Sequence, residues 1–419
     1  MVDPKGNRLV FLLCTPRSGS SLLTAMLHNH SKMFALQEMW FLLSLYDLRM
    51  PVKRAYGGTG ILDRFFNGML PEDTFVQACR AFALQVYNGL LRSSGQAGMI
   101  IDKSPRYYCV LEFLDALFPE SRRIWLVRNP FAILASYKKV SRHRGTRFDL
   151  KTDLRHPNLD MKMVDLTVGL FRYSRYFAKA SPYAFRLSYE KLVTDPRTEL
   201  ANVCRFLGTE YEDGMEKYGN RKNSVKADLF YSMGVGDPFL ADHAEPHPDS
   251  VHLWKDVLNK EEVELYGRAI GARIFHELGY EEPLAEAERW TGVRFPMEPD
   301  EELLAWRTRQ LKEAAGFRWE KDYELGAASA AGRETIPADL PEAAEEGAET
   351  GTDAQVLQLQ MTLRAMERRL ENSIREQMRL RSQLEAMRAK ANRLKALLPF
   401  GNRLAHLASA YLNRGGGKS

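Results

Sequence analysis

Short apolar runs alternate with longer amphipathic stretches over the first 280 residues of the chain. Continuous apolar runs of this length are typical of strands buried on both faces, and the amphipathic stretches between them predict helices. The five predicted strands are residues 8–14, 32–37, 98–103, 122–127 and 184–189, and residues 21–30 form the first predicted helix. The alternation predicts an α/β fold: a parallel five-stranded sheet of the P-loop type with helices on both faces.

A different apolar period appears near the C-terminal end of the chain. Apolar side chains recur there at alternating steps of three and four residues, which predicts a coiled coil over residues 354–399. The positions are Val356, Leu359, Leu363, Met366, Leu370, Leu380, Leu384, Met387, Ala391, Leu394 and Leu398, with Ser373 and Gln377 at two interior places. The alternative is a single amphipathic helix that packs on the body.

Composition divides the chain into four segments. A body of catalytic size spans residues 1–325. Residues 326–353 are rich in Ala, Glu, Gly, Thr and Pro and almost lack large apolar side chains, which predicts a flexible linker. The coiled coil follows, and residues 400–419 form a basic tail.

The charge is unevenly distributed. The net charge is +5, but from Asp353 onward there are 13 Lys and Arg against 5 Asp and Glu, which leaves 46 against 49 for the rest of the chain. The nearly neutral body gives no argument for nucleic acid. The basic tail allows peripheral contact with an anionic membrane surface.

The four cysteines are Cys14, Cys79, Cys109 and Cys204. Their wide spacing predicts neither a zinc site nor a disulfide framework. No apolar run reaches the length of a membrane span, and residues 9–13 are too short for the core of a signal peptide. We therefore expect a cytoplasmic protein.

Polar residues follow each predicted strand. The loop 15–21 (TPRSGSS) follows the first strand, and Glu38, Lys103, Arg128 and Tyr189 stand at the ends of the other four. In a parallel sheet the carboxyl ends of the strands meet at one edge, where ligands bind. We therefore expect these side chains to surround one crevice.

The first of these loops predicts an anion site, because its backbone N–H groups and the following helix dipole would both face a phosphate or sulfate. Aligned with the kinase-type P-loop, Cys14 replaces the first glycine and Ser20 replaces the lysine. The missing lysine argues against an ATP- or GTP-hydrolysing enzyme. The loop alone also fits an ordinary Ser-Gly turn with a serine cap.

These motifs resemble those of the sulfotransferases that use 3′-phosphoadenosine 5′-phosphosulfate (PAPS). TPRSGSS resembles their 5′-phosphosulfate loop, with Arg17 as in the bacterial and tyrosylprotein-sulfotransferase-like branch. RRIWLVRNPFAILASY resembles their 3′-phosphate motif, in which Arg128 and Ser136 would hold the phosphate. DKSPRYY and RLSYEKLVTDPRTELANVCRFLG also match family segments, and the resemblance spans residues 8–280.

The resemblance implies roles for particular residues. Arg17, Lys103 and Glu38 would be catalytic, with Glu38 as the base; for Glu38 the alternative is a structural ion pair. The implied donor-binding residues are Pro16, Arg17, Ser18, Gly19, Ser20, Ser21, Arg128, Ser136, Tyr189, Ser250 and Trp254. No metal is needed, although His243, His247 and His252 lie close together in the sequence.

The predicted function is transfer of a sulfuryl group from PAPS to an acceptor hydroxyl, with a carbohydrate or glycolipid as the preferred acceptor. A small molecule or a tyrosine hydroxyl is the alternative. A rival from another class is a nucleotide-binding interaction protein that carries the coiled coil. The presence of Arg17, Lys103, Arg128 and Glu38 favours the enzyme. The coiled coil predicts a homo-oligomer.

Overall fold

The structure is a computed structural model of the 419-residue chain, and it describes residues 1–50, 55–95, 98–219, 230, 237–240, 243–315, 363, 370, 374 and 376–387. The chain divides into two compact units, Met1–Thr362 and Leu363–Ser419. Each unit is described by itself.

The first unit is built on five parallel strands in the order β2-β3-β1-β4-β5. The strands are β1 (Leu9–Leu13), β2 (Met33–Leu36), β3 (Met99–Lys103), β4 (Arg122–Val127) and β5 (Ala184–Ser188). Each lies inside the run predicted from the sequence. Every residue of β1 and β2 is buried, as continuous apolar runs require. The predicted parallel α/β fold is confirmed.

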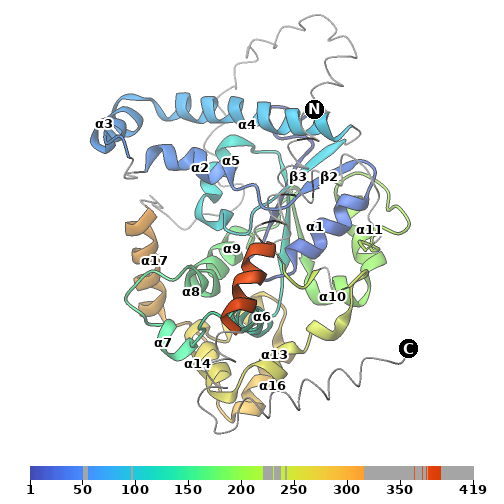
Figure 1. The fold of residues 1–419 in the computed structure, drawn as a ribbon, viewed down its shortest axis with the longest axis vertical. Coiled ribbons are helices and arrows are strands. Elements are labelled where there is room, and N and C mark those ends of the chain that lie inside the picture. Colours follow the sequence, from blue (N-terminus) through green and yellow to red (C-terminus); the bar gives the residue numbers. More distant parts are fainter. Residues whose placement is uncertain are drawn as a thin grey trace, which may run out of the picture. The chain divides into compact units, whose positions relative to one another are not determined.

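Helices cover both faces of this sheet (Figure 1). Alternate residues of β1 point to opposite faces. Val10 and Leu12 belong to an apolar cluster with α1 and α11, whereas the Phe11 ring lies 6.0 Å from the ring of Tyr107 on the other face. The sheet is therefore buried between two layers, and only its edges are left for a site.

The helices of the first unit within the described residues are α1 (Ser20–Asn29), α2 (Phe41–Tyr46), α3 (Thr59–Asp63), α4 (Glu72–Ser94), α5 (Leu111–Leu117), α6 (Pro130–His143), α7 (Leu150–Asp153), α8 (Met161–Val164), α9 (Leu170–Tyr176), α10 (Tyr189–Thr194), α11 (Pro196–Phe206), α13 (Leu253–Val257), α14 (Lys260–Ile270), α15 (Arg273–Glu277), α16 (Glu281–Thr291) and α17 (Glu301–Ala315). The 3₁₀-helical turns are η1 (Asp47–Arg49), η3 (Tyr107–Cys109) and η6 (Pro248–Ser250). The π-helical segments are η2 (Arg64–Met69) and η4 (Asp165–Gly169).

Local sequence fixes where the two helices nearest the site begin. Gly19 adopts a left-handed conformation directly before α1, and no side chain caps that helix. The side chain of Asn129 accepts a hydrogen bond from the Phe131 N–H, and Pro130 opens α6. Each helix follows a strand through a short connection, so both begin at the carboxyl edge of the sheet.

The second unit contains a helical segment at residues 376–387. Five described positions of the heptad seam are between 46% and 64% exposed: Leu363, Leu370, Leu380, Leu384 and Met387. Most of the predicted coiled coil, all of the predicted linker and the basic tail lie outside the described residues. No helix in the described part of the chain is both long and apolar enough to span a bilayer.

Candidate active site

The loop between β1 and α1 forms a tight cradle. Arg17 and Gly19 both have left-handed backbone angles, with φ of 74° and 91°. A Cβ atom on Gly19 would lie 2.3 Å from the ring of Tyr189, so only glycine fits beneath that ring. The Thr15 and Ser18 hydroxyls are hydrogen-bonded at 2.9 Å and brace the loop from inside. The uncapped N-terminus of α1 is left to face a ligand.

Arg17 brings together residues that are distant in sequence. Its Nε donates a hydrogen bond to the Ser136 hydroxyl at 3.2 Å, which joins the loop to the first turns of α6. Its Nη2 forms an ion pair with the Asp237 carboxylate at 3.1 Å. Arg17, which was predicted to hold the 5′-phosphosulfate, therefore lies beside Ser136, which was predicted to hold the 3′-phosphate with Arg128. Asp237 is a partner that the sequence did not indicate.

Arg128, at the end of β4, is directed toward the same loop. Its guanidinium donates to the backbone carbonyls of Arg17 at 2.9 Å and Ser250 at 3.0 Å, and it lies 4.1 Å from the ring centroid of Tyr189. The Arg128 Nε is buried and has no hydrogen-bond partner among the described residues. A buried donor without a partner is costly, which suits a site that awaits an acceptor.

Tyr189 and Ser250 also belong to this cluster. Their hydroxyls are 2.5 Å apart, so the η6 turn contacts the start of α10 through Ser250. Trp254 does not belong to it. Its side chain is 1% exposed and packs against Phe131 and Trp290 in the core. The contact of Trp254 with the nucleotide stays a prediction.

Lys103 and Glu38 form an ion pair across the ends of β3 and β2, with Nζ and Oε1 3.2 Å apart. Lys103 is fully buried, whereas the Glu38 side chain is 33% exposed. Burial lowers the pKa of Lys103, and Glu38 opposes that shift. The indole N–H of Trp40 donates a second hydrogen bond to Glu38 at 2.8 Å. The arrangement offers a partly exposed carboxylate beside a buried cation.

The sequence did not indicate the residues that support this pair. Asp102 precedes Lys103 and accepts hydrogen bonds from Tyr87, Tyr107 and Ser104, which anchors the end of β3. The signal that could have identified Asp102 as a supporting residue was its position directly before Lys103. Asp165 and Asp237 come from segments without a motif, and no signal in the sequence marks them.

Two histidines of the late segment, His243 and His247, lie next to each other. The rings of His243 and His247 are 3.8 Å apart, and His247 pairs with Asp249 at 3.4 Å. Within the ranges that the structure describes, no group of three or more metal-ligating side chains occurs. The four cysteines are free and buried.

Comparisons with known proteins identify similar sequences. A model of the sulfotransferase family matches residues 10–213. The nodulation protein NoeE of Sinorhizobium fredii is 29% identical over 293 residues, which is 67% of this chain and 67% of NoeE.

Two sulfotransferase domains of known structure are also similar. The domain of the Synechococcus PCC 7002 olefin synthase has 23% identity and a TM-score of 0.41, and the match covers 62% of this chain and 92% of that domain. The domain from the curacin biosynthetic pathway has 21% identity and a TM-score of 0.43, and the match covers 65% of this chain and 97% of that domain.

The fold is a parallel α/β sheet whose carboxyl edge carries Arg17, Arg128 and the Lys103–Glu38 pair. The chain is similar to the sulfotransferase family over residues 10–213, and the comparisons support sulfotransferase activity.

Proposed function

We propose that this enzyme transfers the sulfuryl group of PAPS to a hydroxyl of a carbohydrate or glycolipid acceptor. The observation that carries the proposal is the convergence of Arg17, Ser136 and Arg128 around the uncapped N-terminus of α1, next to the Lys103–Glu38 pair. The first group suits the phosphates of the donor, and the pair suits the transfer step.

The donor would be held at two points. The 5′-phosphosulfate suits the loop amides and the Arg17 guanidinium, since both supply hydrogen bonds to anionic oxygens. The 3′-phosphate suits Arg128, whose Nε lacks a partner, together with Ser136. Asp237 occupies one arm of Arg17 in this structure, so donor binding would exchange a carboxylate for an anion of the ligand.

In the transfer step the acceptor oxygen forms a bond to sulfur while the bond from sulfur to the phosphate oxygen breaks. Glu38 takes the proton of the acceptor hydroxyl. Lys103 stabilises the charge that develops on the leaving phosphate oxygen. Positioning and electrostatics dominate such a reaction, as they do in phosphoryl transfer.

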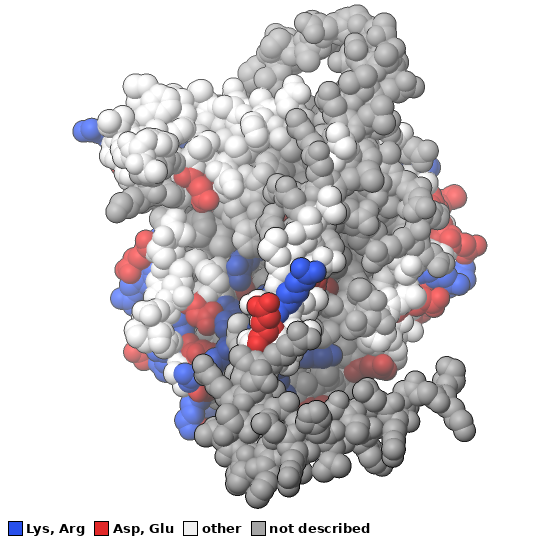
Figure 2. All heavy atoms as spheres, viewed as in Figure 1, with Lys and Arg blue, Asp and Glu red and all other residues white. Residues whose placement is uncertain are grey.

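The acceptor proposal is supported by the surroundings of Glu38. Trp40 places a half-buried indole beside the base, which suits the apolar face of a sugar ring. Beyond it, the segment from α2 to α4 exposes the large apolar side chains Leu48, Ile61, Phe65, Met69 and Phe82. Figure 2 shows few charged side chains over α3.

A cavity of about 460 Å³ beside this segment is lined by the apolar side chains of Tyr46, Phe66 and Phe113 and by the charged side chains of Arg49, Glu72 and Glu112. The exposed apolar side chains favour an acceptor that carries an apolar part in addition to its sugar. Four buried free thiols suit a reducing compartment, which supports a cytoplasmic location.

The exposed heptad positions support homo-oligomerisation through the second unit.

The test is transfer of labelled sulfate from PAPS to free oligosaccharides, glycolipids, small phenols and tyrosine peptides, compared at equal concentration. We expect labelled oligosaccharide or glycolipid as the main product. Label only on phenols or peptides would contradict the acceptor proposal. Absence of any PAPS-dependent product, with no binding of 3′-phosphoadenosine 5′-phosphate, would contradict the donor proposal.

A further inference from the structure

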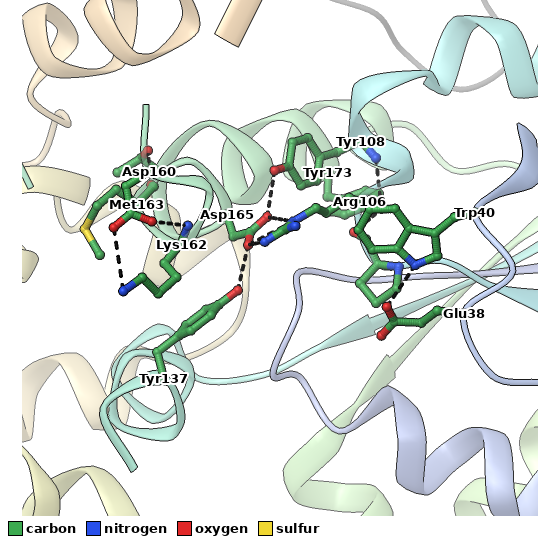
Figure 3. Close-up of polar contacts among 12 residues, drawn as sticks. Glu38, Trp40, Arg106, Tyr108, Tyr137, Asp160, Lys162, Met163, Asp165 and Tyr173 are labelled. Carbon is green, nitrogen blue, oxygen red and sulfur yellow. Dashed lines mark hydrogen bonds and ion pairs between the residues drawn. The ribbon is translucent and has the colours of Figure 1, made fainter. Parts of the chain in front are cut away.

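A buried carboxylate outside the strand-end motifs lies close to Trp40 and Glu38. Asp165 opens the π-helical turn η4, and its side chain is fully buried. It accepts two-pronged hydrogen bonds from Arg106, at 3.0 Å from Nε and 2.9 Å from Nη2. The hydroxyls of Tyr108 and Tyr137 donate to it at 2.7 Å each (Figure 3).

These four donors fix the position of Asp165 and Arg106 together. Burial raises the pKa of Asp165, and the bonds from Arg106 and the two tyrosines oppose that shift. For Arg106 burial opposes the charge, and the bonds to Asp165 outweigh it and raise the pKa. A buried carboxylate that accepts hydrogen bonds from four donors is held in one position. The guanidinium of Arg106 therefore has one well-defined place.

Arg106 in turn contacts the residue that holds the base. Its guanidinium carbon lies 5.6 Å from the ring centroid of Trp40, within the range of a cation–π interaction. The indole N–H of Trp40 donates to Glu38 at 2.8 Å. Contacts thus run without a break from Asp165 through Arg106 and Trp40 to Glu38 (Figure 3).

The backbone of Trp40 shows that this residue needs external support. Its φ of 59° and ψ of −1° are left-handed. For a bulky residue this conformation costs about 1–3 kcal/mol and persists only where surrounding contacts maintain it. The packing of Arg106 over the indole is a contact of that kind. It holds the indole ring where its N–H can donate a hydrogen bond to Glu38.

We propose that Asp165 is a positioning residue for the base Glu38, acting through Arg106 and Trp40. The proposal rests on the proposed function in taking Glu38 as the base. Tyr137 adds a second connection, because it follows Ser136 on α6 and donates to the same carboxylate. Asp165 therefore joins the element that carries the donor-binding serine to the residue that orients the base.

The experiment follows the indole N–H signals of the full-length enzyme labelled with ¹⁵N-tryptophan. The chain has 6 tryptophans, and the Trp40 signal is the one lost in Trp40→Phe. Besides Trp40, the groups facing Glu38 are Lys103 from β3 and Cys14 from the end of β1. We expect the Trp40 signal to shift in Glu38→Gln, because its indole N–H then donates to an amide and not to a carboxylate.

Asp165→Asn should move the Trp40 signal away from its wild-type position, because the Arg106 fork loses its charged partner and the ring loses its support. The other five indole signals should stay in place. The matched control is Asp115→Asn, which removes another buried carboxylate held by an arginine and a tyrosine, Arg123 and Tyr176. It should leave the Trp40 signal unchanged.

Turnover gives the second readout. Asp165→Asn and Trp40→Phe should each lower kcat about ten- to hundredfold, since small misplacement of a reacting group has effects of that size. The dissociation constant of 3′-phosphoadenosine 5′-phosphate should change less than about twofold. If the two variants act on one relay, the double variant should lose little more than either single variant.

Each contrary result has a distinct meaning. An unchanged Trp40 signal in Asp165→Asn, or wild-type turnover in Trp40→Phe, would overturn the relay. If Asp165→Asn does not fold, Arg106→Lys takes its place, since lysine keeps the charge but cannot form the fork; an unmoved Trp40 signal there would equally overturn it. Wild-type turnover in Glu38→Gln would instead overturn the base assignment of the proposed function, and this proposal with it.

Discussion

Arg17 shows how one residue can combine backbone and side-chain roles. Its left-handed backbone turns the loop, its carbonyl accepts a hydrogen bond from Arg128, and its guanidinium contacts Ser136 and Asp237. Two positive groups are thus held side by side with few acidic partners. Such a pair is unfavourable without an anion, so the donor's phosphates would complete the site rather than merely enter it.

The role of Glu38 is tested by Glu38→Gln. Glutamine has nearly the same shape but cannot accept the proton of the hydroxyl, so kcat should fall by about two to four decades. Binding of 3′-phosphoadenosine 5′-phosphate, measured by calorimetry, should stay within about twofold of wild type. Near-normal turnover would move the base to another residue, such as a histidine of the late segment.

Arg128→Ala tests the 3′-phosphate assignment. The loss of a charge-assisted contact should raise the dissociation constant of the 3′-phosphorylated nucleotide more than about tenfold. The nucleotide without the 3′-phosphate should bind wild type and variant almost equally. Arg122→Ala is the matched control, because Arg122 lies at the opposite end of β4 and contacts Leu207 instead. Equal weakening for both nucleotides would contradict the assignment.

The cysteines should be inert in the folded enzyme. Burial raises the pKa of Cys14 to about 12 and that of Cys79 and Cys204 to about 11, and it also raises the pKa of Cys109. The reactive thiolate is therefore scarce at pH 8. Mass spectrometry after treatment with iodoacetamide at pH 8 should find no adduct on native protein and four on unfolded protein. Rapid labelling of native Cys14 would show that the loop opens.

At the scale of elements, the junction of β1 and α1 depends on Gly19. Gly19→Ala would place a Cβ against the Tyr189 ring at a left-handed φ. We expect the free energy of unfolding to fall by about 1–2 kcal/mol from the backbone alone. Affinity for 3′-phosphoadenosine 5′-phosphate should also fall, because the cradle and Tyr189 must separate.

The control for this change is Gly89→Ala, within α4, where an added Cβ meets no atom within 4 Å. That variant should be as stable as wild type or more so, since alanine favours helices. Thermal melts with and without the nucleotide measure both effects. Full retention of nucleotide stabilisation in Gly19→Ala would show that the loop tolerates displacement of Tyr189.

The strands and their ends were the elements that the sequence predicted well. Buried parallel strands need continuous apolar runs, and the ends of such runs are visible, so Glu38, Lys103 and Arg128 could be placed at one edge. The packing of Trp254 against Phe131 and Trp290 could not be predicted from its motif. Asp165 and Asp237 could not be found, because their partners Arg106 and Arg17 are 59 and 220 residues away in sequence.

At the scale of the whole molecule, the two units are predicted to have separate tasks. The site described above is formed within the first unit, and every residue proposed to act in it precedes Thr291. The described heptad positions of the second unit expose leucine and methionine side chains. Burial of one such side chain contributes about 1.5–3 kcal/mol, so association of several copies through this seam is the expected outcome.

The test compares the full chain with a truncated chain ending at Gly326. Analytical ultracentrifugation should give a multiple of the 47.9 kDa chain mass for the full chain and a monomer for the truncated one. Sulfuryl transfer per site should be equal within about twofold, because association does not supply a residue of the site.

A variant of the full chain with Leu380 and Leu384 both replaced by Glu is the matched control. It keeps the length of the chain and should be monomeric, since like charges on the seam repel across a coiled coil. Equal masses per particle for the full and truncated chains would remove the oligomer proposal, and loss of transfer in the truncated chain alone would show that the tail contributes to the reaction.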